Sequence, residues 1–275
     1  MPKMQRPQTL RGLSQILARH GQRALIVSDP APNFRVPPNR VVVDIAGVKT
    51  LSVVNRRGGK VVIGTGATFG RVLNQISGEN GLLKQAISAL ANPLVRNKVA
   101  VLTALDPESP YLDLTTALVT LGSRVQVQSP TGARKITIDD FLLEAVEGLR
   151  KGEYPSHIEF QTLDEADRVG FFRINPGGGK PTVSASVKMK LRRNLAIGPE
   201  IAVSSSTVIP IRAPQAEKAL TRLLINDNNV SSVANVAAAE MLEFADIEDD
   251  PYEHSLIAVA VSRAIRRMNE TPPAH

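Results

Sequence analysis

Two glycine-rich segments are the places where this chain of 275 residues could bind a phosphate group through its backbone. Residues 177–180 read Gly-Gly-Gly-Lys, but Pro181 stands where a phosphate-binding loop has Ser or Thr. Because proline also prevents the helix whose N-terminus would face the anion, we expect a flexible hairpin loop there. Residues 64–67, Gly-Thr-Gly-Ala before a predicted helix, are the better candidate for an anion site, although they lack the third glycine of a dinucleotide-binding fingerprint.

The residue types that most often carry catalysis or bind metals are absent or isolated. The sequence contains no Cys, which excludes disulfides, thiolate zinc sites, cysteine nucleophiles and iron–sulfur ligation by this chain. Its four His residues have no partner at metal-ligand spacing, and the three serines at 204–206 lack the glycines of a nucleophile elbow. The acidic pairs at 139–140 and 249–250 lie where predicted helices begin, so capping explains them.

Composition narrows the class of protein further. Hydrophobic residues make up 43% and charged residues 21% of the sequence, as in a folded globular protein. The net charge is +7, but the basic residues are dispersed, Trp is absent and aromatic residues are only 4%, which argues against nucleic-acid binding. We expect a cytoplasmic protein with no transmembrane span and no secretory signal.

The spacing of apolar residues predicts both helices and strands. Helices are expected at residues 10–20, 68–76, 82–90, 112–121, from 139 onward, and at 216–224, 231–244 and 253–268. Strands are expected at 24–27, 40–45, 51–54, 60–64, 124–128, 135–138, 158–163, 171–174, 183–191 and 200–210. A mixed N-terminal part followed by a sheet and then helices predicts the α+β class.

Short motifs occur along the chain in an order that points to a family. They are residues 10–21, 42–45 (Val-Val-Asp-Ile), 62–68 (Val-Ile-Gly-Thr-Gly-Ala-Thr), 95–97 (Val-Arg-Asn), 106–118, 132–141, 171–173 (Phe-Phe-Arg), 210–220 and 251–264. From Thr9 to about Met268, their order resembles the FAD-binding (medium) subunits of molybdenum hydroxylases, the family of carbon monoxide dehydrogenase and xanthine dehydrogenase.

This resemblance implies a fold and a role. The fold is the vanillyl-alcohol-oxidase-type (PCMH) FAD-binding fold of two subdomains, expected at residues 1–58 and 59–164. A C-terminal α+β domain of the carbon monoxide dehydrogenase flavoprotein type follows at 165–275. The implied role is electron relay, in which FAD accepts electrons from an iron–sulfur subunit supplied by a molybdenum subunit. FAD then passes these electrons to NAD, oxygen or a quinone.

The first FAD-binding loop departs from the family pattern. It reads alanine-glycine-glycine-threonine in the family and Ser28-Asp29-Pro30-Ala31 here. Pro30 has no backbone N–H to donate to a phosphate. The Asp29 carboxylate would repel each phosphate charge by roughly 4 kcal/mol at ~4 Å and an effective dielectric of ~20, before screening.

The second loop departs in the same way. The family has threonine-isoleucine-glycine-glycine-asparagine after an arginine–asparagine pair, whereas residues 100–104 here are Ala-Val-Leu-Thr-Ala. Leu102, Thr103 and Ala104 therefore stand at the two glycines and the asparagine. Without glycine, backbone N–H groups are hindered from approaching the pyrophosphate. Asp113 and Arg173 remain as candidate ribityl and ring contacts that the resemblance implies, although either could instead be a structural ion-pair residue.

These observations predict a homologue of the FAD subunit with impaired or lost flavin binding and a structural or interaction role. No cofactor is then expected in this chain, and iron–sulfur and molybdenum-cofactor chains are the expected partners. Two alternatives stay open at this point. One is a working FAD subunit with modified loops, which would make the chain an oxidoreductase subunit. The other is a stand-alone basic module that binds anions or nucleic acid.

Overall fold

The computed structural model describes residues 4–28, 38–76, 81–90, 92–175, 183–205, 208–247 and 250–268. The chain divides into two compact units, each made of several segments. The N-terminal unit comprises residues 1–75, 91–106 and 123–161, and the C-terminal unit comprises residues 76–90, 107–122 and 162–275. The predicted three-part division at 58 and 164 stays a prediction. In the described part of the chain, no helix is long and apolar enough to span a membrane.

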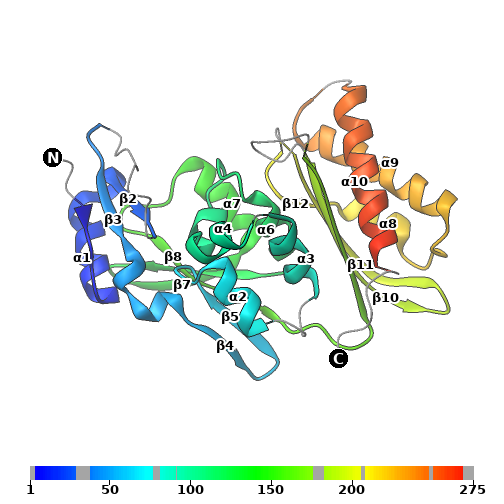
Figure 1. The fold of residues 1–275 in the computed structure, drawn as a ribbon. Coiled ribbons are helices and arrows are strands. Elements are labelled where there is room, and N and C mark those ends of the chain that lie inside the picture. The colour runs from blue at the N-terminus through cyan, green and yellow to red at the C-terminus, as the bar shows by residue number, and fades with distance from the viewer. Residues whose placement is uncertain are drawn as a thin grey trace. The chain divides into compact units, whose positions relative to one another are not determined.

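The N-terminal unit begins with a small parallel sheet and one amphipathic helix (Figure 1). The strand order is β1-β3-β2, with β1 at Met4–Gln5, β2 at Ala24–Val27 and β3 at Val41–Asp44. Helix α1 (Leu10–His20) starts as predicted, because the Thr9 side chain accepts a hydrogen bond from the Gly12 N–H. Its buried face joins the core of this sheet through Leu13 and Leu17.

A five-stranded antiparallel sheet forms the rest of this unit, in the order β4-β5-β8-β6-β7. Its strands are β4 (Val54–Arg57), β5 (Lys60–Gly64), β6 (Arg124–Ser129), β7 (Gly132–Thr137) and β8 (Tyr154–Gln161). The helices of the same part of the chain are α2 (Phe69–Ile76), α4 (Pro93–Lys98), α5 (Val101–Ala104) and α7 (Ile138–Glu147). The strands expected at 124–128 and 135–138 pair as an antiparallel hairpin, in which Ser129 pairs directly with Gly132.

The predicted strand at 51–54 is wrong. Residues Lys49–Ser52 form a 3₁₀ helix, and the strand begins only at Val54. The reason is tertiary, because the Leu51 side chain is fully buried in the core beside α1. Its carbonyl oxygen also accepts the N–H of Gly66 at 2.8 Å, which holds the chain in a turn instead of a ladder.

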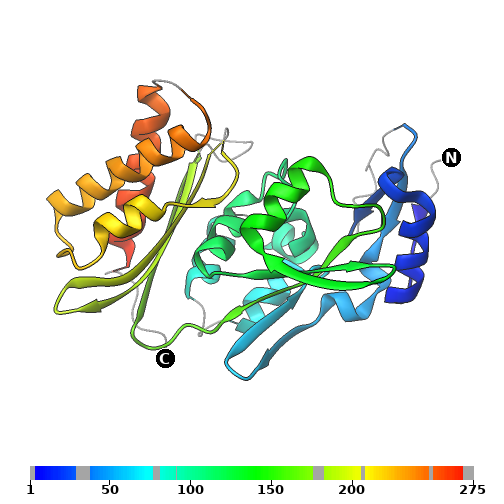
Figure 2. The same ribbon diagram turned by 180° about the vertical axis from the view of Figure 1, so that it is seen from behind.

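The C-terminal unit is built on a four-stranded antiparallel sheet in the order β12-β11-β10-β9 (Figures 1 and 2). The strands are β9 (Asp167–Ile174), β10 (Val183–Arg192), β11 (Leu195–Ser205) and β12 (Ile211–Arg212). Helices α8 (Pro214–Leu220), α9 (Asp227–Phe244) and α10 (Pro251–Arg267) cover one face, and α3 (Gly81–Leu90) and α6 (Leu112–Thr120) contact the other. The α+β class is therefore confirmed.

Alternation along β10 separates the two faces of this sheet. Val183, Ala185, Val187 and Met189 are buried in the apolar core under α8–α10. The residues between them point to the opposite face, where Ser184 and Ser186 meet α6. The sheet thus has one apolar face and one face that carries hydroxyl groups and charges.

Candidate functional site

Only one residue of the predicted first FAD-binding loop is placed. Ser28 directly follows β2 and is half-buried, while Asp29, Pro30 and Ala31 lie outside the described residues. Since β2 and β3 are parallel, Ser28 lies at the same sheet edge as the end of β3, where Val27 pairs with Asp44.

The second loop is described in full, and it is a short helix. Leu102, Thr103 and Ala104 belong to α5, where Leu102 is half-buried, Thr103 is exposed and Ala104 is buried. The N–H of Val101 donates to the carbonyl oxygen of Ala67 at 2.9 Å. The N–H of Leu102 donates to Thr65 O at 2.7 Å, and that of Thr103 donates to Ala100 O at 3.0 Å. Three consecutive backbone donors are therefore already used within the unit.

The side chain of Leu102 reinforces this arrangement. It packs against the apolar cluster that contains Leu13 and Leu17 of α1. Turning the Leu102 N–H outward would break the hydrogen bond to Thr65 and disturb this packing. The residues of the second loop do not fit a pyrophosphate, because such a group needs backbone N–H groups that point toward it.

The backbone N–H groups of the candidate anion segment at 64–67 also donate hydrogen bonds within the fold. The N–H groups of Gly64 and Gly66 donate to Val53 O and Leu51 O, each at 2.8 Å, and that of Thr65 donates to Ser156 O at 3.0 Å. A Cβ at position 64 would lie 2.1 Å from Leu51 O. The glycine is needed there for a close approach of two backbones, and the N–H groups of this candidate segment are not available to an anion. The other glycine-rich segment, at residues 177–180, lies outside the described residues.

Asp113 and Arg173 form an ion pair inside the C-terminal unit. Asp113 is fully buried in the first turn of α6, and its Oδ2 lies 3.2 Å from Arg173 Nε on β9. Arg173 also donates from Nη1 to the carbonyl oxygen of Ala89 at 2.7 Å. Burial raises the pKa of Asp113 to about 6, although the Arg173 guanidinium and the Ser184 hydroxyl act in the opposite direction.

This pair has unmet hydrogen-bonding capacity. Among the described residues, neither Asp113 carboxylate oxygen nor Arg173 Nε has a hydrogen-bond partner of standard geometry. Buried polar atoms in this state are uncommon in folded proteins and often mark a functional position. The structure thus brings two predicted site residues, Asp113 and Arg173, together. Of the other predicted site residues that it describes, three belong to α5 and Ser28 follows β2.

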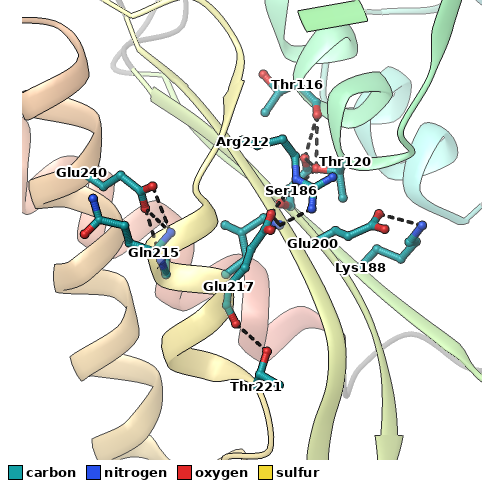
Figure 3. Close-up of polar contacts among 12 residues, drawn as sticks. Thr116, Thr120, Ser186, Lys188, Glu200, Arg212, Gln215, Glu217, Thr221 and Glu240 are labelled. Atoms are coloured by element: carbon teal, nitrogen blue, oxygen red, sulfur yellow. Dashed lines mark hydrogen bonds and ion pairs between the residues drawn. The ribbon is translucent and has the colours of Figure 1, made fainter. Parts of the chain in front are cut away.

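A layer of buried hydroxyl groups lies beside Asp113, and the sequence analysis missed it. Thr116 Oγ1 lies 2.9 Å from both Ser184 Oγ and Ser204 Oγ, and the two serines lie 2.8 Å apart. Ser186 donates to the carbonyl oxygen of Thr116 at 2.9 Å and contacts the Thr120 hydroxyl (Figure 3).

This hydroxyl layer holds α6, and with it Asp113, against the sheet. The available signal in the sequence was the period-two spacing of Ser184 and Ser186 and the i, i+4 spacing of Thr116 and Thr120.

An open cleft of about 420 Å³ lies in the N-terminal unit beside β2. Its apolar wall includes Ala24 and Ile26, and its rim includes Arg40, Arg150 and Lys151. Glu153 also lines the cleft, so its charged rim carries both signs and does not by itself indicate an anion site.

Comparison with known proteins decides the family. Residues 2–159, more than half of the chain, match the family described as FAD binding domain in molybdopterin dehydrogenase. The chain belongs to this family. The resemblance read from the sequence is thereby confirmed.

Two known proteins with related sequences align with most of this chain. The glyceraldehyde dehydrogenase medium chain of Sulfolobus acidocaldarius is 22% identical over 243 residues, covering 87% of this chain and 86% of the relative. The 6-hydroxypseudooxynicotine dehydrogenase complex subunit alpha of Paenarthrobacter nicotinovorans is 23% identical, covering 81% of this chain and 79% of the relative.

Solved structures confirm the PCMH-type fold. A chain of the reconstituted CO dehydrogenase from Oligotropha carboxidovorans matches with a TM-score of 0.86 at 18% identity, and the match covers 98% of each chain. A chain of quinoline 2-oxidoreductase from Pseudomonas putida 86 matches with a TM-score of 0.83 at 19% identity, covering 98% of this chain and 97% of the other.

Proposed function

We propose that this chain is a subunit of a molybdenum-hydroxylase-like complex that has lost or greatly weakened FAD binding and acts as a structural or interaction subunit. The observation that carries the proposal is the use of three consecutive N–H groups, of Val101, Leu102 and Thr103, inside the fold. These groups occupy the loop that would face the pyrophosphate in a flavin-binding relative. A phosphate that competed for them would have to break hydrogen bonds that hold α5 in place.

The sequence of the first loop supports the same conclusion. Asp29 and Pro30 stand where the family pattern has two glycines, so one position adds a negative charge and the next lacks an N–H. Both loops would therefore oppose the binding of a pyrophosphate. In this proposal the chain carries out no redox step through FAD.

The partners in this proposal are an iron–sulfur chain and a molybdenum-cofactor chain. Two relatives carry the words "medium chain" and "complex subunit" in their names, which supports membership of a multisubunit assembly. The absence of Cys means that any iron–sulfur cluster of such an assembly is held by another chain. A cytoplasmic location is part of the same proposal.

An absorbance spectrum of the purified chain, followed by calorimetric titration with FAD, tests the loss of flavin. We expect no band near 450 nm and no heat of binding from a sample whose circular dichroism shows it to be folded. Flavin that co-purifies with the chain, or micromolar binding, would overturn the proposal. Co-expression with iron–sulfur and molybdenum-cofactor chains tests the interaction role independently, because co-purification does not require FAD.

A second candidate, a working FAD subunit with modified loops, has one specific observation in its favour. Asp113 and Arg173 are buried with unmet hydrogen-bonding capacity, as expected for residues that face a ligand. If this candidate is correct, the wild-type chain binds FAD and Asp113→Asn weakens that binding. The same titration therefore separates the two candidates.

A further inference from the structure

At one end of the four-stranded sheet, the face that carries Lys190 and Arg192 is exposed in the described part of the chain. Along β10, Ser184 and Ser186 lie under α6, and Lys190 and Arg192 follow on the same face by strand alternation. Arg192 is exposed at the end of the β10–β11 hairpin. In Figures 1 and 2 this hairpin end extends past α8 at the edge of the unit.

The hairpin end is held rigidly. The turn between β10 and β11 is made by Arg193 and Asn194, with φ of 51° and 62°. Residues 222–225 run alongside it, and Leu195 forms a bridge with Leu224. The N–H of Ala196 donates to Leu223 O at 2.9 Å, so the segment is pinned to β11 by backbone hydrogen bonds. The surface is therefore formed before any partner binds.

Apolar side chains occupy the centre of this surface. Leu224 is 49% exposed and Ile197 is 39% exposed. Leu195 lies opposite Leu224 and points to the same face, and Ile197 follows Leu195 by two residues. These side chains form a small aliphatic patch instead of a single exposed residue.

Three exposed arginines lie close to these apolar residues along the hairpin and the segment beside it, and no ion pair with another described residue neutralises them. Arg192, Arg193 and Arg222 are exposed and form no ion pair among the described residues. The sequence has no acidic residue at 188–199 or at 218–226. The two nearby lysines differ, because Lys188 pairs with Glu200 at 2.7 Å and Lys190 pairs with Asp164. We call Arg192, Arg193, Ile197, Arg222 and Leu224 the hairpin-tip patch.

Backbone conformation adds an independent observation. Arg193 and Arg222 have φ of 51° and 64°, in the left-handed region that glycine adopts at lower cost. Local folding therefore does not explain why these two positions carry arginine. Arginine therefore occupies these two positions at a conformational cost, and residues in this state cluster at binding sites.

We propose that the hairpin-tip patch is a docking surface for a partner protein that presents an acidic surface with an apolar centre. This inference rests on the interaction role under the proposed function. Arginine is enriched in protein interfaces, and oppositely charged surfaces steer association. A protein fits better than a nucleic acid, because the centre is aliphatic and has no aromatic side chain on which bases could stack.

The test compares two charge-reversed forms of the full chain, each co-expressed with the iron–sulfur and molybdenum-cofactor chains. The first carries Arg192→Glu, Arg193→Glu and Arg222→Glu. The matched control carries Arg11→Glu, Arg23→Glu and Arg57→Glu, which are exposed arginines of the N-terminal unit. We expect the first form to bind the partner at least about tenfold more weakly and with a shallower salt dependence, and the control to bind as the wild type does.

Two further variants separate the apolar contribution from the charges. Ile197→Ser with Leu224→Ser should also weaken binding about tenfold, but with the salt dependence of the wild type. A photo-crosslinking residue at position 197 should attach to an acidic segment of the partner chain, identified by mass spectrometry.

Several outcomes would overturn the inference. If the wild type forms the complex and charge reversal at the patch has no greater effect than the control, the docking surface is wrong while the proposed function stands. If the wild type forms no complex, both are wrong. Self-association of the wild type, or bound nucleic acid, that disappears on charge reversal would assign the patch to a second copy or to nucleic acid.

Discussion

The backbone N–H of Leu102 donates to the carbonyl oxygen of Thr65 at 2.7 Å. These residues are 37 positions apart, and their hydrogen bond fixes the segment that stands at the second FAD-binding loop of the family. A glycine loop would leave its N–H groups available to a phosphate. Here carbonyl oxygens of the same chain accept these hydrogen bonds. This links the altered sequence directly to the proposed loss of FAD binding.

Restoring glycine should restore affinity for FAD. We expect the chain with Asp29→Gly, Pro30→Gly, Leu102→Gly and Thr103→Gly to bind FAD measurably. Its dissociation constant should lie at least about tenfold below the highest FAD concentration at which the wild type gives no heat, equivalent to ~1.4 kcal/mol. Glycine frees the backbone to turn its N–H groups outward, and the Asp29 charge is removed. Calorimetry measures the change. Alanine at the same four positions is the control, and an equal gain with alanine would contradict the role of backbone freedom.

Asp113 should make the protein less stable as the pH rises from about 4 to 6. Burial raises the pKa of Asp113 from the ordinary 3.8 of an aspartate to about 6 in the folded chain. The folded state therefore holds this proton more tightly, and the free energy of unfolding falls as the proton is lost, by about 2 kcal/mol between pH 4 and 6.

Urea unfolding at pH 4, 5, 6 and 7 measures this dependence. Asp113→Asn should remove most of the fall, because the amide does not titrate. Asp227→Asn, at an exposed carboxylate, should leave the fall in place. A fall that persists unchanged in Asp113→Asn would show that other groups cause it.

Replacing each of the two threonines of the hydroxyl layer should lower the free energy of unfolding by different amounts. Thr116→Val removes hydrogen bonds to both Ser184 and Ser204, and we expect a loss of about 1–2 kcal/mol in the free energy of unfolding. Thr120→Val should cost less, about 0.5–1 kcal/mol, because Ser186 still donates to the carbonyl oxygen of Thr116. Urea unfolding measures both, and the reverse order would show that the Thr120–Ser186 contact is the stronger one.

A methyl group at position 64 should disrupt the N-terminal unit. The Cβ of Gly64→Ala would lie 2.1 Å from Leu51 O, and we expect a destabilisation of about 3 kcal/mol or more, or failure to fold. Gly12→Ala, within α1, should change stability by less than about 1 kcal/mol, since its Cβ meets its nearest atom at 3.3 Å. A fully stable Gly64→Ala variant would contradict the close backbone approach.

Local patterns were sufficient for much of the fold. Thr9 as an N-cap and the hairpin at 129–132 were readable because caps and two-residue turns depend on nearby residues. The strand predicted at 51–54 failed because Leu51 bonds to Gly66, a contact that periodicity does not reveal. Asp113 and Arg173 were both named from the family resemblance, but only the folded chain brings them within 3.2 Å.

The sequence by itself determined the α+β class, the family and the absence of Cys ligands, and it predicts the replacement of both glycine pairs. Those properties depend on residue type and order alone. Only the tertiary structure decided that the N–H of Leu102 is already used and that hydroxyls of α6 and β10 meet. It also showed that Ile197 and Leu224 are exposed, near arginines that form no ion pair with another described residue. Hydrogen bonding and exposure depend on which distant segments pack together, and residues many positions apart meet only when the chain has folded.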